Sequence, residues 1–263
     1  MSATPVESDR GGETVDAFHR GDFWVVQPAR GHRSGMDAMM LAAAVPGSFA
    51  GRLADLGAGA GAAGLAVASR CPRAHVVLVE NEPEMAAYAR KSIALPQNAR
   101  LRGRAEVVEA DVTLTGKART AAGLADDAFD FAIMNPPFNA GHDRPTPDAL
   151  KRRAHVMEAG TLEAWVRTAA AIVKPRGGFA AIVRPVSLPV LLDALAGRFG
   201  EARIVPVHPR AAEAAIRVIV RATRGSRKAL SLEPPLVLHE ATGHGHAARA
   251  DAVCNGRASL FGD

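Results

Sequence analysis

The sequence predicts an α/β fold with a seven-stranded, mostly parallel sheet, helices on both faces and an antiparallel edge strand. Two observations lead to this expectation. Short apolar or β-branched runs alternate with runs of helix-forming residues, which is typical of parallel strands joined by crossover helices. Near the end, the runs at 204–208 and 215–223 follow each other with no helix between them, which favours a closing antiparallel pair.

Strands are expected where apolar or β-branched runs end at a polar residue or a glycine. They comprise residues 53–56, 76–80, 105–110, 129–134, 179–183, 204–208 and 215–223. Residues 23–26 predict a further short strand in an N-terminal hairpin, and 236–239 favour one final edge strand. A Pro-Gly turn is expected at 174–178, before the fifth strand.

Helices are expected where good helix formers recur, often with one apolar face. They comprise residues 36–45, 62–70, 82–93, 162–173 and 190–198. The polar residues 1–12 are predicted to be disordered, and no regular structure is expected from residue 242 onward. Trp24 and Trp165 are expected as core side chains.

A glycine loop follows the first strand. Gly57, Gly59 and Gly61 can take positive φ and let a ligand approach the backbone, and the next helix start offers free N–H groups. Asp55 is expected to accept a hydrogen bond from a cationic amine or to orient the loop through water. Through Gly59, Gly61 and Gly64 the segment also fits the dinucleotide fingerprint, so a nicotinamide cofactor is an alternative.

Polar residues stand at the ends of the next three strands. Glu80 lies about 20 residues after the glycines, where an acidic residue can bind ribose hydroxyls. Asp111 could accept a hydrogen bond from an adenine amino group, and Asn135 follows the fourth strand. The carboxyl ends of parallel strands share one rim, so we expect these residues to surround one ligand with Asp55. A nicotinamide enzyme would have no use for Asn135.

The tetrad Asn135-Pro136-Pro137-Phe138 indicates chemistry on a planar amino group. The side-chain carbonyl of Asn135 and the backbone carbonyl of the Asn135-Pro136 unit can accept both hydrogens of an exocyclic amine. Pro136 and Pro137 fix φ and remove two backbone donors, and Phe138 offers a ring on which a base could stack. The alternative is a strand that ends in a rigid turn with an aromatic core residue.

The glycine loop, Glu80, Asp111 and the tetrad together resemble the S-adenosylmethionine-dependent methyltransferases that modify amino groups of nucleic acids or of glutamine. An upstream pattern resembles the bacterial methyltransferases that modify adenine N6 in the anticodon loop of valine tRNA. It comprises Thr14, Asp16, Phe18, Gln27, Gly31, Arg33, Gly35, Asp37 and Ala38. His32 stands where that family has a tyrosine.

The resemblance implies a Rossmann-like domain with S-adenosyl-L-methionine as cofactor and RNA, most simply a tRNA, as partner. On it we divide the chain into four parts. They are a disordered tail (1–13), an N-terminal hairpin and helix segment (14–50), a methyltransferase domain (51–223) and a C-terminal extension (224–263).

Several basic residues are candidates for anion binding. Arg33 is expected to bind the cofactor carboxylate or an RNA phosphate, or else to make a surface salt bridge. Residues 139–151 are long enough for a mobile lid. Lys151, Arg152 and Arg153 could then grip phosphates beside a flipped base, or form an exposed helix start.

Composition limits the other classes. The formal charge of +5, from 32 basic and 27 acidic residues, permits a polyanionic partner. Cys71 and Cys254 have no paired spacing, and the histidines at 239, 244 and 246 lack further ligands, so no metal is expected. No apolar run approaches the roughly 18 residues of a spanning helix, and no signal sequence opens the chain, so we expect a cytoplasmic protein away from membranes.

The leading hypothesis is direct methyl transfer from S-adenosylmethionine to adenine N6 of a tRNA. Guanine N2 of ribosomal RNA and a release-factor glutamine are alternatives with the same chemistry. A nicotinamide-dependent oxidoreductase and a non-catalytic RNA-binding module are alternatives of different classes. The oligomeric state is not predicted.

Overall fold

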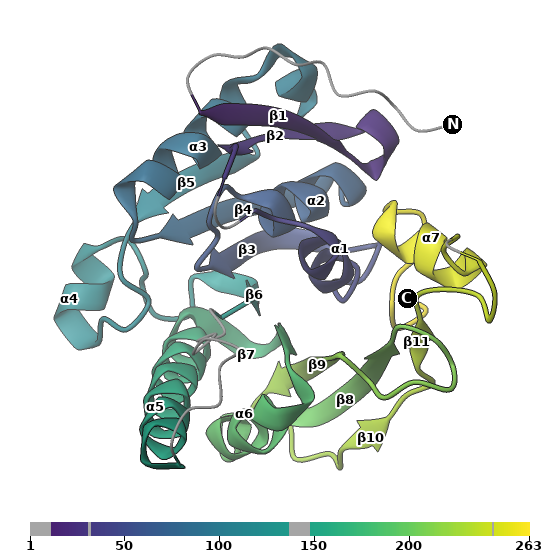
Figure 1. Cartoon of the computed structure of the whole chain (residues 1–263). Coiled ribbons are helices and arrows are strands. Elements are labelled where there is room, and N and C mark those ends of the chain that lie inside the picture. The colour runs from purple at the N-terminus through teal and green to yellow at the C-terminus, as the bar shows by residue number, and fades with distance from the viewer. Residues whose placement is uncertain (1–11, 31–32, 137–147, 244) are drawn as a thin grey trace.

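The computed structural model describes residues 12–30, 33–136, 148–243 and 245–263, with the side chains of 148–159 left out of the description. Within these ranges the chain forms an antiparallel hairpin and a central sheet of nine strands flanked by helices (Figure 1). The hairpin strands are β1 (Glu13–Phe18) and β2 (Phe23–Pro28). The strands of the central sheet are β3 (Ala50–Leu56), β4 (Arg73–Glu80), β5 (Ala105–Glu109), β6 (Phe129–Met134), β7 (Val173–Val183), β8 (Phe199–His208), β9 (Arg217–Arg224), β10 (Ser231–Leu232) and β11 (Leu236–Val237).

The helices fall between these strands, largely where they are expected. They are α1 (Met36–Ala42), α2 (Ala62–Arg70), α3 (Pro83–Ala94), α4 (Gly116–Ala121), α5 (Asp148–Ile172), α6 (Leu188–Leu195) and α7 (Ala248–Cys254), with 3-10 turns η1 (His19–Gly21), η2 (Pro96–Leu101) and η3 (Pro185–Ser187).

The strand order of the central sheet is β10-β8-β9-β7-β6-β3-β4-β5, with β11 also paired to β8. The pairs among β3 to β7 are parallel, and β9 runs antiparallel to both of its neighbours, β7 and β8. The predicted mostly parallel α/β fold is therefore confirmed. The sheet exceeds the seven expected strands because the C-terminal segment returns along β8 and adds β10 and β11 in parallel.

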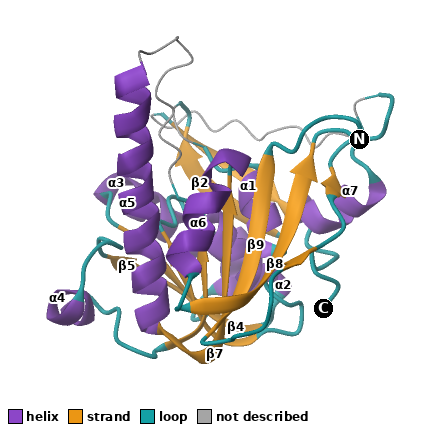
Figure 2. Ribbon diagram, turned by 90° about the horizontal axis from the view of Figure 1, so that it is seen from below, coloured by secondary structure: helices purple, strands orange, loops and turns teal. Residues whose placement is uncertain are grey.

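Helices cover both faces of the sheet because its central strands carry apolar side chains on both sides. Along β6, Phe131 and Ile133 join one core with residues of α1 and α2. Ala132 and Met134 alternate with them and join the other core with residues of α5 and α6. Figure 2 shows α5 and α6 together on one side of the strands.

The turn predicted at 174–178 is absent, since these described residues belong to β7. Arg176 has a positive φ of 66°, and the register between β6 and β7 shifts between Phe129 and Phe131. Residues 174–177 have no partner in the register with β6 or with β9, and pairing resumes at Gly178. The Pro-Gly signal therefore marks an irregular, unpaired stretch inside β7.

Helix α7 lies where no regular structure was expected, so that expectation was wrong. Ala250 and Val253 of α7 are fully buried in the core that also contains α1. A short helix owes its stability mainly to such packing, which local sequence does not reveal. Of the predicted disordered tail, residues 1–11 lie outside the described residues, whereas Gly12 is ordered and Glu13 begins β1, so the tail ends earlier than expected. The predicted lid up to residue 147 also lies outside the described residues, whereas 148–151 belong to α5.

The N-terminal hairpin is fastened to the sheet domain by buried polar side chains. The amide of Asn98 accepts a hydrogen bond from the backbone N–H of Trp24 at 2.9 Å and donates to its carbonyl at 2.6 Å. Ser92 accepts from the N–H of Val26 at 2.9 Å. These bonds pair backbone N–H and C=O groups of β2 on the edge of this strand that does not face β1. Trp24 is thus fixed through its backbone.

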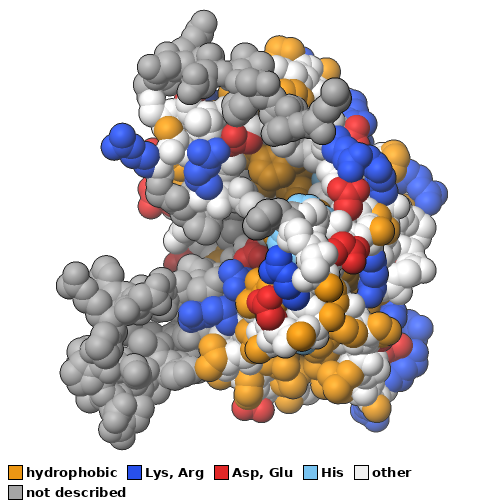
Figure 3. Space-filling model, turned by 45° about the vertical axis from the view of Figure 1, so that its right-hand side comes forward, with side chains coloured by type: hydrophobic (Ala, Val, Ile, Leu, Met, Phe, Trp, Pro, Cys, Tyr) orange, Lys and Arg blue, Asp and Glu red, His pale blue; other side chains and the backbone are white. Residues whose placement is uncertain are grey.

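Charged side chains are distributed and largely paired. Arg20 binds Asp251 at 2.7 Å, and Arg198 binds Glu163 at 2.8 Å. Figure 3 shows Lys and Arg side chains spread around a hollow on one face, with Asp and Glu between them. Among the described side chains drawn there, the basic residues do not gather in one patch.

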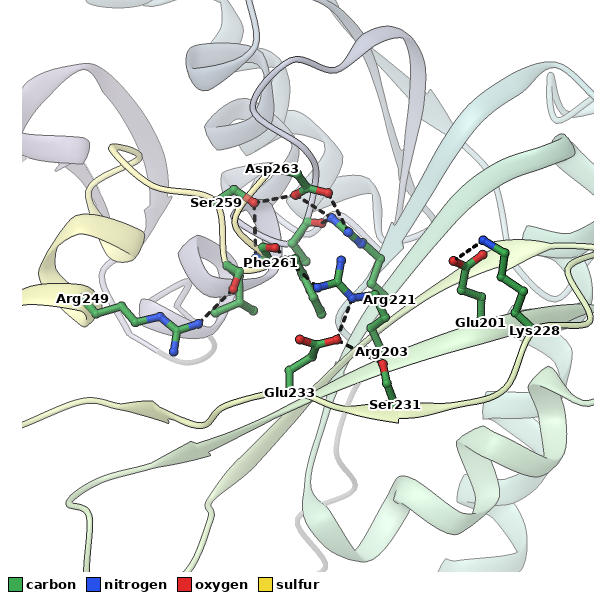
Figure 4. Close-up of polar contacts among 12 residues, drawn as sticks. Glu201, Arg203, Arg221, Lys228, Ser231, Glu233, Arg249, Ser259, Phe261 and Asp263 are labelled. Atoms are coloured by element: carbon green, nitrogen blue, oxygen red, sulfur yellow. Dashed lines mark hydrogen bonds and ion pairs between the residues drawn. The ribbon is translucent and has the colours of Figure 1, made fainter.

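The last residues dock on β8 and β9 through an aromatic and ionic cluster (Figure 4). The ring of Phe261 lies 5.0 Å from the Arg203 guanidinium and 4.3 Å from that of Arg221. Asp263 receives two hydrogen bonds from Arg221, at 2.9 and 2.7 Å. These bonds hold the pKa of the Asp263 carboxyl below its usual range. The N–H of Leu260 also donates to the Ala43 carbonyl at 2.7 Å, so the cluster connects the end of α1 to the sheet.

We predict that Phe261→Ala lowers the free energy of unfolding by about 3 kcal/mol, because it removes a nearly buried ring and leaves a cavity between two arginines. Urea unfolding followed by circular dichroism measures the change. Val186→Ala is the control, since Val186 is 53% exposed and should shift stability by less than about 0.5 kcal/mol. Equal stability of the two variants would contradict the conclusion that this cluster stabilises the fold by connecting the end of α1 to the sheet.

Candidate cofactor and acceptor site

The register of three parallel strands brings the expected site residues to one rim. Leu56, the last residue of β3, pairs with Val79 of β4 and with Met134 of β6. Gly57 and Asn135 follow Leu56 and Met134 directly, so the glycine loop and the tetrad begin side by side at neighbouring strand ends. Glu80 stands at the same level on the other side of β3, at the end of β4.

The glycine loop has the backbone that the sequence suggests. Gly57, Gly59 and Gly61 have φ of +71°, +56° and +89°, a region that other residues rarely adopt. The N–H groups of Gly57 and Ala58 both donate to the Val79 carbonyl at 2.9 Å. The loop is thus fixed to β4 before it enters α2.

Asp55 is buried beneath this loop. It is 2% exposed, and its Oδ2 accepts a hydrogen bond from the N–H of Gly64 at 2.8 Å. Burial raises the pKa of the Asp55 carboxyl to about 7, with the Gly64 bond acting against this shift and Glu80 adding to it. Of its two expected roles, orientation of the loop and the first turn of α2 fits this geometry better than contact with a cationic amine.

Glu80 connects the glycine loop to the next helix. Its Oε2 accepts from the N–H of Gly59 at 2.7 Å, and its Oε1 accepts from the N–H of Glu82, just before α3, at 2.9 Å. A carboxylate oxygen has two lone pairs, so each oxygen retains an acceptor site for a ligand hydroxyl. Glu80 can therefore order the loop and face a ribose at the same time.

Asp111 and Asn135 differ in how far their polar atoms are satisfied. Oδ1 of Asp111 accepts from both the N–H and the hydroxyl of Thr113, at 2.7 and 2.8 Å, which holds the turn after β5. Oδ1 of Asn135 is buried and has no hydrogen-bond partner among the described residues. A buried acceptor without a partner lowers the stability of the fold by roughly 1–3 kcal/mol, so a hydrogen-bond donor that reached this atom would be bound favourably.

The upstream residues form one hydrogen-bond network in front of α1. Asp16 Oδ2 accepts from Thr14, from the Gln27 amide at 2.6 Å and from Arg33 at 2.7 Å. Gln27 also accepts from the N–H of Ser34 at 2.9 Å. Arg33 makes the salt bridge that was one of its expected alternatives, and its role as a cofactor or phosphate ligand stays a prediction.

The other expected site residues have limited or no description. Pro136 is buried beside Asn135, while Pro137 and Phe138 lie outside the described residues. Lys151, Arg152 and Arg153 lie in the first turns of α5, and their side chains fall outside the description as well. Their roles remain predictions.

The structure adds two residues that sequence reasoning did not assign to the site. Trp165 of α5 lies against Gly57, and the hydroxyl of Thr168 donates to the Val112 carbonyl at 2.6 Å. Trp165 was expected in the core, and it is only partly buried there. No local signal identifies either contact, because each joins residues far apart in the chain.

No group of three or more His, Cys, Asp or Glu side chains within the described part of the chain could hold a metal ion. Cys71 and Cys254 are both buried and free. Among these residues no helix has the length and apolar character needed to span a bilayer.

The fold and the site define a class. A glycine loop, an acidic residue ending the adjacent strand, and an asparagine level with the loop on the other side lie together at one rim, as the sequence predicts for a cofactor site. The family model described as methyltransferase small domain matches residues 34–205. The chain belongs to this family, so the predicted methyltransferase class is confirmed.

Solved structures agree with the assignment. A crystal structure of an Agrobacterium tumefaciens protein, described as a predicted O-methyltransferase, is 44% identical, with 85% of this chain and 98% of that chain covered and a TM-score of 0.74. A 16S rRNA N2-guanine methyltransferase of T. thermophilus, solved with AdoMet and guanosine, is 21% identical over 85% of this chain and 53% of that one (TM-score 0.54). TYW2 of M. jannaschii, solved with AdoMet, is 14% identical over 82% and 88% of the two chains (TM-score 0.52). The two distant structures show the shared fold. No curated protein sequence matches the chain.

We predict that Asp55→Asn removes a pH dependence of stability. The folded pKa of about 7 lies above the ordinary 3.8, so between these values the folded state keeps a proton that the unfolded state releases. The stabilisation is therefore complete below about pH 4 and is lost as pH rises to about 7, by at most roughly 1.4 kcal/mol per unit.

Urea unfolding of both proteins across this interval measures the effect. Surface carboxylates titrate alike in both and cancel in the difference. The asparagine variant should gain stability relative to the wild type as pH rises. A difference that stays constant with pH would contradict the raised pKa.

Proposed function

We propose that this methyltransferase transfers the methyl group of S-adenosylmethionine to an exocyclic amine, most simply adenine N6 of a tRNA. The cofactor is S-adenosylmethionine, which supplies an activated methyl group. The proposal on the acceptor depends mainly on one observation. The buried Oδ1 of Asn135 has no partner among the described residues and lies at the strand end next to Gly57.

An amino group fits this unsatisfied acceptor. It has two hydrogens, which the side-chain oxygen of Asn135 and the carbonyl of the Asn135-Pro136 unit can accept together. The lone pair of an aromatic amine is conjugated into its ring, and hydrogen bonds to both hydrogens favour a more pyramidal, more nucleophilic nitrogen. Alignment of this nitrogen at the rim then removes much of the entropic barrier. The proton can leave to solvent, so no general base is assigned.

The remaining residues would hold the cofactor. The glycine loop leaves room for a ligand along its backbone, Glu80 retains lone pairs for ribose hydroxyls, and Asp111 lies after β5 where an adenine amino group could donate to it. Arg33 would contribute only if it exchanged its bond to Asp16 for the cofactor carboxylate or an RNA phosphate.

An oxygen acceptor is the second candidate, since the 44% identical A. tumefaciens protein is described as a predicted O-methyltransferase. A hydroxyl offers one hydrogen and would leave one of the two expected acceptors unmatched. It also needs a base to remove its proton, and buried Asp55 is committed to Gly64. These features favour nitrogen.

RNA as the substrate is supported by the upstream pattern. Thr14, Asp16, Gln27 and Arg33, which carry the resemblance to the valine-tRNA enzymes, form one network ahead of α1. We further propose that Lys151, Arg152 and Arg153, which begin α5 after the tetrad, bind phosphates on either side of an unpaired base.

Mass spectrometry of nucleosides from total RNA, and of peptides from total protein, each treated with the protein and labelled S-adenosylmethionine, tests the acceptor. Label in N6-methyladenosine supports the proposal, whereas label in N2-methylguanosine or in glutamine would replace the acceptor within the same chemistry. Label on oxygen would overturn the amine assignment. If calorimetry shows binding of NADPH and not of S-adenosylhomocysteine, an oxidoreductase is favoured. If the protein binds RNA but transfers no label to it, a non-catalytic RNA-binding module is favoured.

We predict that Asn135→Ala lowers kcat on the order of 100-fold, the scale for losing one preorganised hydrogen-bonding group in an active site. Calorimetry should find S-adenosylhomocysteine affinity within about twofold of wild type, because the side chain is assigned to the acceptor. Stability should not fall, since the lost oxygen is unsatisfied in the folded protein.

Asn255→Ala is the matched control. Asn255 follows α7, bonds to Asp251 and lies away from the rim, so its replacement should leave turnover unchanged. Full activity of the Asn135 variant would refute the assigned role.

A further inference from the structure

Helix α5 touches the glycine loop through Trp165. A Cβ built on Gly57 would lie 2.3 Å from Cη2 and 2.7 Å from Cζ3 of the Trp165 indole. Real Cβ atoms do not approach other atoms this closely, so the ring is packed directly on the Gly57 backbone. The lack of a side chain at 57 is therefore required by this contact as well as by the positive φ.

One turn further along α5, Thr168 reaches a second loop of the same rim. Its buried hydroxyl donates to the Val112 carbonyl at 2.6 Å. Val112 follows Asp111, which is expected beside the adenine. Residues three apart lie on one side of a helix, so a single side of α5 contacts the loops after β3 and after β5.

These two residues belong to the core-facing side of α5. Leu162, Val166, Ala169 and Ile172 are at most 2% exposed and follow the helical repeat of a core-facing stripe. Trp165 falls on this same stripe and packs against the core, yet it is only partly buried. Because its ring also lies on the Gly57 backbone, Trp165 joins the core-facing side of α5 to the loop that a cofactor would approach.

We propose that Trp165 and Thr168 are positioning residues for the cofactor: α5 holds the glycine loop and the Asp111 loop at a fixed separation. The inference rests on the proposed function, since it takes these loops as the cofactor site.

Cofactor affinity, measured by calorimetry with S-adenosylhomocysteine, tests the proposal without any acceptor. Trp165→Ala should weaken binding about tenfold or more, because small displacements of a site cost such factors. Trp165→Phe, which keeps an aromatic ring, should recover most of the affinity. Thr168→Val should weaken binding about three- to tenfold, the range for one hydrogen bond, and Thr168→Ser should restore it.

Ile172→Ala is the control for a purely structural role. Ile172 is fully buried at the far end of α5, so its truncation should lower Tm while leaving affinity within about twofold. If the Trp165 and Ile172 variants lose equal stability and bind the cofactor alike, Trp165 is a packing residue and the proposal is overturned.

Fluorescence gives a second readout in a folded, unperturbed site. The chain has two tryptophans, so Trp24→Phe leaves Trp165 as the sole strong emitter. S-adenosylhomocysteine should quench or shift this emission with the Kd found by calorimetry. No change in emission during saturable binding would contradict the position assigned to the ring.

The two proposals fail in distinguishable ways. If the wild-type protein does not bind S-adenosylhomocysteine, the proposed function and this inference both fall. If the wild type binds while the Trp165→Ala and Thr168→Val variants bind equally well, only the inference is overturned.

Discussion

The parallel register of β3 with β4 and β6 is the constraint on which the rest of the structure depends. Backbone hydrogen bonds place Leu56 level with Val79 and Met134, so three loops leave the sheet at one height. Side chains alternate between two buried cores along these strands, and a slip of one residue would exchange every inward side chain. Burial on both faces therefore fixes the register, and the register fixes the site.

Buried polar groups at this rim divide into two kinds. The carboxylates of Asp55 and Glu80 are held by backbone N–H groups of α2 and of the glycine loop, so they shape the loop before any ligand arrives. The oxygen of Asn135 is buried without such a partner among the described residues. In the proposed function, the first kind preorganises the cofactor loop and the second offers an acceptor to a donor from outside. The proposal thereby assigns cofactor binding and recognition of the methyl acceptor to different groups.

The segments outside the central strands stabilise this arrangement from a distance. The C-terminal residues around Phe261 connect the end of α1 to β8 and β9, and the network around Asp16 orders the approach to α1. On the opposite face α5 spans two loops of the rim. The site is thus supported from both sides of the sheet, which is how a loop of glycines can be held in one conformation.

The sequence by itself determined the α/β class, the strands that carry Asp55, Glu80 and Asn135, and helix 62–70, because apolar periodicity and glycine spacing are local signals. It also predicted that the polar residues at the strand ends lie together, since the carboxyl ends of parallel strands meet at one edge of the sheet. Only the tertiary structure decided that Arg33 pairs with Asp16, that α7 forms, and that Trp165 lies on Gly57. Each of these depends on contacts between residues far apart in the chain. Such contacts form only after the sheet has brought its elements together, and no local pattern encodes them.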